Sequence, residues 1–207
     1  MIIVEELLNI DLPKFKATYN VKWIEGTDFD SLKNVKQANG VIFNDEGNIL
    51  IINIVGNWQL PGGHIEKGES YEDGLIREID EEADAEIKDI TPIGNLRVAE
   101  IKDGKIKPEI VQLYYFGRIE RLKRQTIDPA FNKIGKRKFI EPEEFTNYIP
   151  WGNTGKKIIQ KAKEVFSEKI KLVSNIKEIK LEFMEPLKDF KGFKKEIDIF
   201  IDEVHPP

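Results

Sequence analysis

The feature that most constrains this chain is the segment LPGGHIEKGESYEDGLIREIDEEADAEI, residues 60–87, in which a Pro-Gly-Gly turn leads into an acidic stretch. Ser70 with Asp73 three residues later is a capping-box variant, which predicts a helix over about residues 71–83. Apolar residues recur on one side of this helix, and that side is predicted to pack against a sheet. They are Leu75, Ile76, Ile79 and Ala83.

Three carboxylates share another side of the same helix. Glu78, Glu81 and Glu82 stand at i, i+3 and i+4, so their side chains lie on one face. Like charges at this spacing oppose helix formation by roughly 0.2–0.5 kcal/mol per pair, and Arg77 is the one basic residue of the helix. Clustered carboxylate oxygens suit Mg²⁺. Taken alone, the triad still fits a solvated acidic helix better, because glutamate is a good helix former.

The two glycines before the helix favour the cation site over the solvated helix. Gly62 and Gly63 permit a positive φ and a close approach of the backbone to a ligand. A carbonyl group of this turn can therefore join the carboxylates around one cation.

The segment resembles the Nudix box, whose pattern is G-x5-E-x7-R-E-U-x-E-E-x-G-U, with U a bulky aliphatic residue. The match covers residues 63–85 and has every charged position at its spacing. The matching residues are Gly63, Glu69, Arg77, Glu78, Ile79, Glu81 and Glu82. Asp84 stands in place of the final glycine, and Ala85 stands at the last aliphatic position. Aspartate adopts the left-handed conformation more readily than most residues, so we expect a strained but intact helix end.

The resemblance implies an α/β fold, namely a Nudix-type α/β/α sandwich around a mixed β-sheet with short N- and C-terminal extensions. It implies a Nudix-type pyrophosphohydrolase that uses Mg²⁺ or Mn²⁺. Such an enzyme cleaves the diphosphate bond of a nucleoside diphosphate linked to another moiety, as in a nucleoside triphosphate or an ADP-linked metabolite. By the same resemblance Glu78, Glu81 and Glu82 are metal ligands, and the residue at Glu78 is instead the base in some members. The Gly62 carbonyl is a further candidate ligand.

Two charged residues beside the triad are predicted to position it. Arg77 lies within helical reach of Asp73 and Glu81, so we expect charge-assisted hydrogen bonds to the acids and no contact with substrate. Glu69, in the turn before the helix, is expected to orient Arg77 or the loop. The predicted catalytic set is Arg77, Glu78, Glu81 and Glu82.

The pattern along the chain predicts three regions. Residues 36–166 form the Nudix domain, with a hairpin around residues 44–48, strands in ITPIGNLRVAEI and EIVQLYYFGRIERL, a short strand in KFIEPEEF and a helix in NTGKKIIQKAKEVF. Residues 1–35 form an N-terminal extension in which YNVKWI fits a short strand. Residues 167–207 form a C-terminal extension, in which IKEIKLEF fits a strand or a helix. After Pro186 an amphipathic helix is predicted to pack on the core, a dimer contact being the alternative; its apolar residues are Phe190, Phe193, Ile197, Phe200 and Val204.

Composition excludes several classes of protein. The net charge of −5 offers no electrostatic footprint for nucleic acid. The chain has no cysteine, so disulfides, thiolate metal sites and thiol nucleophiles are excluded. No run of apolar residues approaches the roughly 20 that a membrane span requires, and the N-terminus has acids where a signal peptide has basic residues. We expect a cytoplasmic protein with a small-molecule nucleotide substrate.

Other residues are weaker candidates. Trp58 and His64, on either side of the Pro-Gly-Gly turn, could contact substrate, although each could equally have a structural role. Aromatic residues at 114–116 are expected to pack in the core. Glu100, Glu109 and Glu120 are candidates for an additional catalytic acid, and the basic stretch RLKRQTIDPAFNKIGKRKF is expected to be a solvated loop.

Two alternatives belong to other functional classes. One is a Nudix-fold module that binds or senses a nucleotide without turnover; such modules commonly lose box acids, which are intact here. The other is an isomerase of the same fold that acts on an isoprenoid diphosphate, whose relatives use a cysteine that this chain does not have.

Overall fold

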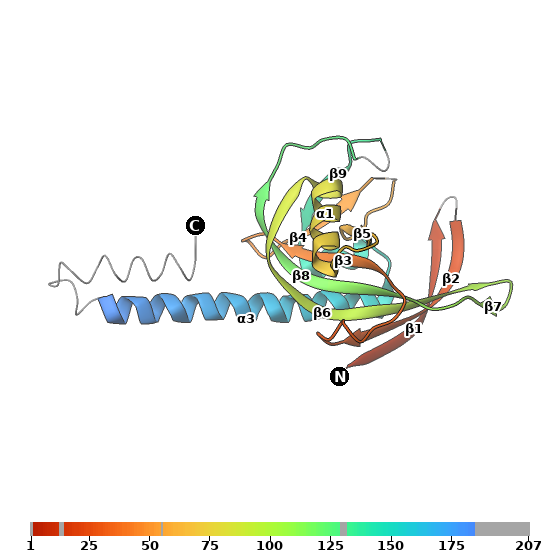
Figure 1. Cartoon of the computed structure of the whole chain (residues 1–207), viewed down its shortest axis with the longest axis horizontal. Coiled ribbons are helices and arrows are strands. Elements are labelled where there is room, and N and C mark those ends of the chain that lie inside the picture. The colour runs from red at the N-terminus through yellow and green to blue at the C-terminus, as the bar shows by residue number, and fades with distance from the viewer. Residues whose placement is uncertain (1, 13–14, 55, 129–131, 185–207) are drawn as a thin grey trace. The chain divides into compact units, whose positions relative to one another are not determined.

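The computed structural model describes residues 2–12, 15–54, 56–128 and 132–184 (Figure 1). The chain divides into two compact units, residues 1–166 and residues 167–207. The strands are β1 (Ile3–Leu12), β2 (Phe15–Glu25), β3 (Val35–Phe43), β4 (Ile49–Asn53), β5 (Gly62–His64), β6 (Ala85–Lys102), β7 (Lys105–Ile106), β8 (Ile110–Leu122) and β9 (Lys136–Ile140). The helices are α1 (Tyr71–Ala83), the 3₁₀ turn η1 (Pro142–Glu144), α2 (Phe145–Tyr148) and α3 (Gly152–Met184).

The first unit contains one nine-stranded mixed sheet. Its order is β1-β2-β6-β8-β3-β4-β9, with β5 paired to β3 and β7 paired to β6. Strand β3 runs parallel to β8, and β6 runs antiparallel to β8. The α/β class and the mixed sheet predicted from the sequence are confirmed.

Each face of the sheet carries its own hydrophobic cluster. Helix α1 covers one face through Leu75, Ile79 and Ala83, which pack with residues of β3, β4 and β8. On the opposite face, α2 and the start of α3 pack through Phe145, Ile158 and other apolar residues on aromatic side chains that include Trp23, Tyr114 and Phe116. The two clusters make the sheet the middle layer, because its strands are buried on both sides.

The N-terminal residues form a hairpin that extends the sheet. Strands β1 and β2 pair antiparallel, and β2 pairs along β6 with Trp23 opposite Leu96. YNVKWI was predicted to be a short strand, and it lies inside the longer strand β2. Because Trp23 is fully buried in the core cluster, this hairpin shares its core with the predicted Nudix domain.

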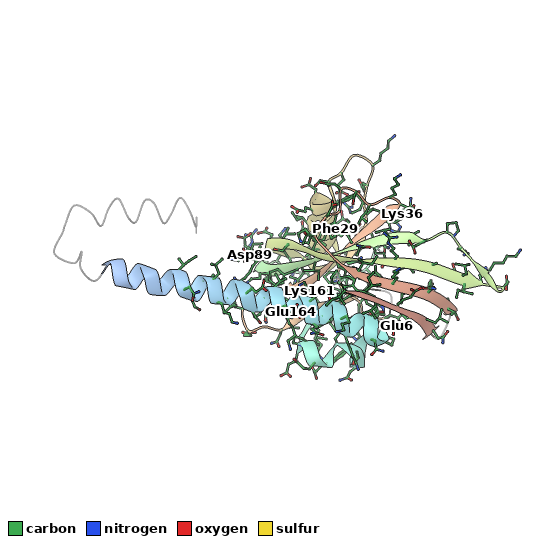
Figure 2. The ribbon with its side chains drawn as sticks, turned by 90° about the horizontal axis from the view of Figure 1, so that it is seen from below. Glu6, Phe29, Lys36, Asp89, Lys161 and Glu164 are labelled. Atoms are coloured by element: carbon green, nitrogen blue, oxygen red, sulfur yellow. The ribbon has the colours of Figure 1, made fainter. Side chains whose placement is uncertain are left out.

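A single carboxylate connects this hairpin to α3. Glu6 Oε1 accepts a hydrogen bond of 2.8 Å from the backbone N–H of Thr154, at the beginning of α3. Figure 2 labels Glu6 where the N-terminal hairpin meets the start of that helix. The first N–H groups of a helix have no partner within the helix, and a negative charge is favoured there. Glu6 therefore caps α3 from a strand that is 148 residues away in sequence.

The C-terminal region follows one of its two predicted alternatives. IKEIKLEF, residues 176–183, belongs to α3, so the helical alternative is the observed one. The predicted helix after Pro186 lies outside the described residues. Within the described ranges, no helix combines the length and the apolar character that a membrane crossing needs.

We predict that Glu6→Ala lowers the free energy of unfolding by about 1–2 kcal/mol, because the helix N-terminus loses its cap. Chemical denaturation measures the change. Glu5→Ala is the matched control, since Glu5 is exposed on the neighbouring position of the same strand. Equal stability of the two variants would contradict the capping role.

Candidate active site

Helix α1 begins and ends where the sequence predicts. Ser70 Oγ accepts a hydrogen bond of 3.1 Å from the N–H of Asp73 and donates one of 2.6 Å to its carboxylate. Three of the four predicted apolar residues are buried, whereas Ile76 is 42% exposed, so its assignment to the buried side was wrong. Position 76 follows Leu75 by one residue, a rotation of about 100°, and it falls beyond the edge of the packed stripe.

Glu82 is the most buried of the three predicted metal ligands. The residue is 8% exposed, and its Oε2 accepts a hydrogen bond of 2.8 Å from the N–H of Gly62. Burial raises the pKa of the Glu82 carboxyl to about 8, and the negative charges of Glu78, Asp128 and Glu81 act in the same direction. Helix α1 and the Pro-Gly-Gly turn therefore meet at a carboxyl that resists ionisation.

Glu78 and Glu81 share one cationic partner. Arg77 Nη1 donates to Glu78 Oε1 over 2.9 Å and to Glu81 Oε2 over 3.4 Å. Burial raises the pKa of Glu81, and Glu78 and Asp128 add to the rise while Arg77 opposes it. Glu78 also lies against Gly63, where a Cβ atom would collide with the Glu78 carboxylate. A side chain at position 63 would therefore displace this acid.

Arg77 is itself held by the turn before the helix. Its Nε and Nη2 donate to the two carboxylate oxygens of Glu69 over 2.9 and 3.0 Å, a bidentate geometry. Arg77 Nη2 also donates to the His64 carbonyl over 2.9 Å. Hydrogen bonds to Glu69 and Glu78 keep the pKa of Arg77 above its ordinary value. Asp73, which the sequence suggested as a partner of Arg77, instead caps the helix with Ser70.

Gly62 holds a backbone conformation that other residues rarely adopt. Its φ is 137°, and it pairs with Asn39 of β3 in a short antiparallel ladder. A Cβ atom there would collide with the carbonyl of Ala38. The tight pairing of β5 on β3 thus requires glycine, and it directs the Gly62 N–H to Glu82.

Asp84 ends helix α1 in the left-handed conformation, as predicted, with φ 47° and ψ 50°. Its carboxylate also has a role that the sequence did not indicate. It accepts hydrogen bonds from the backbone N–H and the hydroxyl of Thr126, over 2.9 and 2.6 Å. The adjoining carbonyls of Ala83 and Asp84 accept from Arg137 Nη1. The residue that replaces glycine therefore fastens the segment between β8 and β9 to the helix end.

That segment carries an acid that sequence reasoning missed. Asp128 is 3% exposed, and its charge contributes to the raised pKa of both Glu81 and Glu82. The predicted extra acids lie elsewhere: Glu100 pairs with Lys107 and Glu109 with Arg97, and Glu120 is exposed. Asp128 stands inside the stretch that looked like a basic solvated loop, and an isolated acid among lysines and arginines leaves no periodic signal.

The two candidates for substrate contact, Trp58 and His64, lie in different environments. Trp58 packs edge-on with Tyr148, with ring centroids 6.0 Å apart, on the sheet face opposite to α1. His64 is exposed and contributes its backbone to the Arg77 contact. The aromatic residues at positions 114–116 are buried, as expected for core residues.

The donors at this end of α1 are chemically suited to a hard divalent cation. They are the carboxylates of Glu78, Glu81, Glu82 and Asp128 and the backbone turn at Gly62, and mutual repulsion among the carboxylates is what a cation would offset. In the described part of the chain, however, no three acidic or histidine side chains converge in a ligating arrangement. Glu78 and Glu81 point to Arg77 and Glu82 points to Gly62, so metal binding would require these side chains to rotate.

Comparison with known proteins identifies the family. A family model described as the NUDIX domain matches residues 33–162. The structure of the Bacillus subtilis pyrophosphohydrolase BsRppH is similar with a TM-score of 0.56 and 21% identity, over 76% of this chain and 97% of that one. A C. elegans Ap4A hydrolase matches with a TM-score of 0.46 and 20% identity, over 65% of this chain and 99% of that one.

The chain belongs to the NUDIX family. Its class is that of the Nudix-type pyrophosphohydrolases, which confirms the family and the class predicted from the box at residues 63–85.

In metal-free protein we predict that stability falls as pH rises from about 5 to about 8. The pKa of Glu82 is 4.5 in an ordinary environment and about 8 in the fold, so the folded state binds this proton more tightly and loses that advantage on deprotonation. Denaturation in the presence of a chelator measures the slope. Glu82→Gln should flatten it, whereas Asp80→Asn, a change at an exposed position of the same helix, should not. Parallel curves for all three proteins would contradict the prediction.

We further predict that Asp84→Gly lowers the free energy of unfolding by about 1–5 kcal/mol. Glycine relieves roughly 1–2 kcal/mol of left-handed strain, but two hydrogen bonds to a charged group are lost, each of about 1.5–3 kcal/mol. Thr126→Val removes one of the two donors of the same contact. The losses in the double variant should therefore be smaller than the sum of the single losses, and strict additivity would contradict the contact.

Proposed function

We propose that the chain is a divalent-metal-dependent hydrolase that cleaves the diphosphate bond of a nucleoside diphosphate linked to another moiety. A nucleoside triphosphate or an ADP-linked metabolite would be such a substrate. The observation that carries this proposal is the full set of box acids at one end of α1, joined by Asp128 and adjacent to the glycine turn. The printed description of BsRppH, a pyrophosphohydrolase of similar fold, agrees with it.

The proposed metal is Mg²⁺ or Mn²⁺, with Glu78, Glu81, Glu82 and the Gly62 carbonyl as its ligands. When bound, such an ion would neutralise the phosphate oxygens and lower the pKa of a coordinated water. The carboxyl of Glu82 sits where burial and neighbouring acids penalise its charge. A bound cation would offset this penalty on the charge of Glu82. The environment of Glu82 therefore supports its assignment as a metal ligand.

The protein's own groups have distinct proposed roles. Arg77 positions Glu78 and Glu81 through its hydrogen bonds, and Glu69 positions Arg77. One carboxylate of the cluster accepts the proton of the attacking water, with Glu78 and Asp128 as the two candidates. His64, which is exposed beside the glycine turn, remains a candidate for substrate contact, and Trp58 is a candidate only through its sequence position before that turn, since its ring packs on Tyr148.

We predict that Glu82→Gln lowers kcat at least about 100-fold on whichever substrate the wild type turns over, because the neutral amide cannot share in holding the cation. The assay measures phosphate-containing products from a panel of nucleoside triphosphates, dinucleoside polyphosphates and ADP-linked compounds, with Mg²⁺ or Mn²⁺. Asp80→Asn is the matched control, since this acid lies on α1 and pairs with Lys123.

The outcomes separate the three functional classes. Turnover that survives Glu82→Gln would reject the site. Nucleotide binding without turnover on any member of the panel would favour a regulatory Nudix-fold module. Rearrangement of an isoprenoid diphosphate without release of phosphate would favour an isomerase. The cytoplasmic location and a homodimer stay predictions.

A further inference from the structure

A second concave site lies at the other end of helix α1. It is a cavity of about 600 Å³, within the size range of small-molecule sites. The loop between β2 and β3 forms one wall through Asp28, Phe29 and Asp30, and the start of α1 forms another through Tyr71 and Glu72. Residues 28–30 precede the region that matches the family model, residues 33–162. The wall that they form is therefore contributed by the N-terminal extension.

One polar group at this cavity has no hydrogen-bond partner among the described residues. Tyr115 lines the cavity and is 2% exposed, and its hydroxyl makes no hydrogen bond with any residue in the described ranges. Burial raises the pKa of Tyr115, and the charges of Glu72 and Asp30, which line the same cavity, raise it further. The hydroxyl is not among the fully buried atoms that have no partner, so it is accessible from the cavity, and a ligand bound there could form a hydrogen bond with it.

The charges around the cavity all have the same sign. Its lining includes four carboxylates, Asp28, Asp30, Glu69 and Glu72, and no lysine, arginine or histidine. Glu69 is paired with Arg77, and Asp28 accepts a hydrogen bond from Ser31. Asp30 and Glu72 form no ion pair within the part of the chain that the structure describes. The cavity therefore repels anions, and three of its carboxylates, Asp28, Asp30 and Glu72, have no ion-pair partner within the described residues.

The apolar part of the lining is aromatic. Phe29 is buried and meets Tyr115 edge-to-face, with ring centroids 5.2 Å apart, and the half-buried ring of Tyr71 forms a further side. Figure 2 labels Phe29 close to helix α1. Aromatic faces attract organic cations and also accommodate their alkyl chains. A bare metal ion would gain little from these rings.

We propose that this cavity binds a small organic cation, a primary amine or diamine with a short alkyl chain. Its ammonium group lies between Asp30 and Glu72 and donates a hydrogen bond to the Tyr115 hydroxyl. Its alkyl chain lies against Phe29 and Tyr71. The site is separate from the proposed metal ligands Glu78, Glu81 and Glu82, although Glu69 of the box lines its edge, and its existence does not depend on the proposed hydrolase activity.

Isothermal titration calorimetry with 1,4-diaminobutane as the probe tests this assignment. The wild type should bind one equivalent, and 1,4-butanediol, of the same length without charge, should bind at least about tenfold more weakly. The double variant Asp30→Asn with Glu72→Gln should lose at least about tenfold in affinity. Tyr115→Phe, which removes the hydroxyl alone, should lose roughly threefold to tenfold, as expected for one hydrogen bond.

The control variant carries the same change in net charge. Glu120→Gln with Glu168→Gln alters two exposed acids that do not line the cavity, and it should bind the diamine like the wild type. Binding should also persist in Glu82→Gln, which separates this test from the test of the hydrolase. The proposal is overturned if the wild type does not bind the diamine, if the diol binds equally well, or if the control loses as much affinity as the cavity variant.

Discussion

Repulsion among carboxylates is the constraint on which the site depends. Glu78, Glu81, Glu82 and Asp128 come from a helix and from a distant loop, and the other three each add to the cost of ionising the buried Glu82. The fold offsets the repulsion with two groups of its own. Arg77, which Glu69 holds in place, donates to Glu78 and Glu81, and the N–H of Gly62 donates directly to Glu82. These hydrogen bonds stabilise the charged carboxylates in the positions that the fold gives them.

The contacts between the Pro-Gly-Gly turn and helix α1 fix the positions of the acids. Gly62 and Gly63 are required for different reasons: a side chain at Gly62 would strike the backbone of β3, and one at Gly63 would strike Glu78. The conformation of the turn thereby sets the position of two acids. Asp84 adds a third connection, since it holds the loop that carries Asp128 at the end of the helix.

The N-terminal extension contributes to the molecule in two separate places. Its hairpin lengthens the sheet beside β6, and Glu6 caps α3 on the face opposite to α1. The loop that follows the hairpin returns to the α1 face, where Phe29 packs on Tyr115 and closes one wall of the cavity. The two ends of α1 therefore differ in chemistry, although both are acidic. One gathers carboxylates around backbone and arginine donors, and the other combines carboxylates with aromatic rings.

The sequence by itself determined the helix, its cap, the left-handed Asp84 and the family. These features depend on residues within a few positions of one another, so the spacing of those residues is enough to predict them. It also predicted where the central strands lie along the chain, because alternation of apolar residues is local. It misplaced Ile76, which lies one step beyond the packed stripe, and it left the helical and extended alternatives open for residues 177–183.

Only the tertiary structure decided which distant groups meet. Asp128 joins Glu81 and Glu82 across more than 40 positions of chain, Glu6 reaches Thr154 across 148, and Phe29 meets Tyr115 on the α1 face of the sheet. Such encounters depend on strand register and on loop closure, and neither leaves a periodic trace in the sequence.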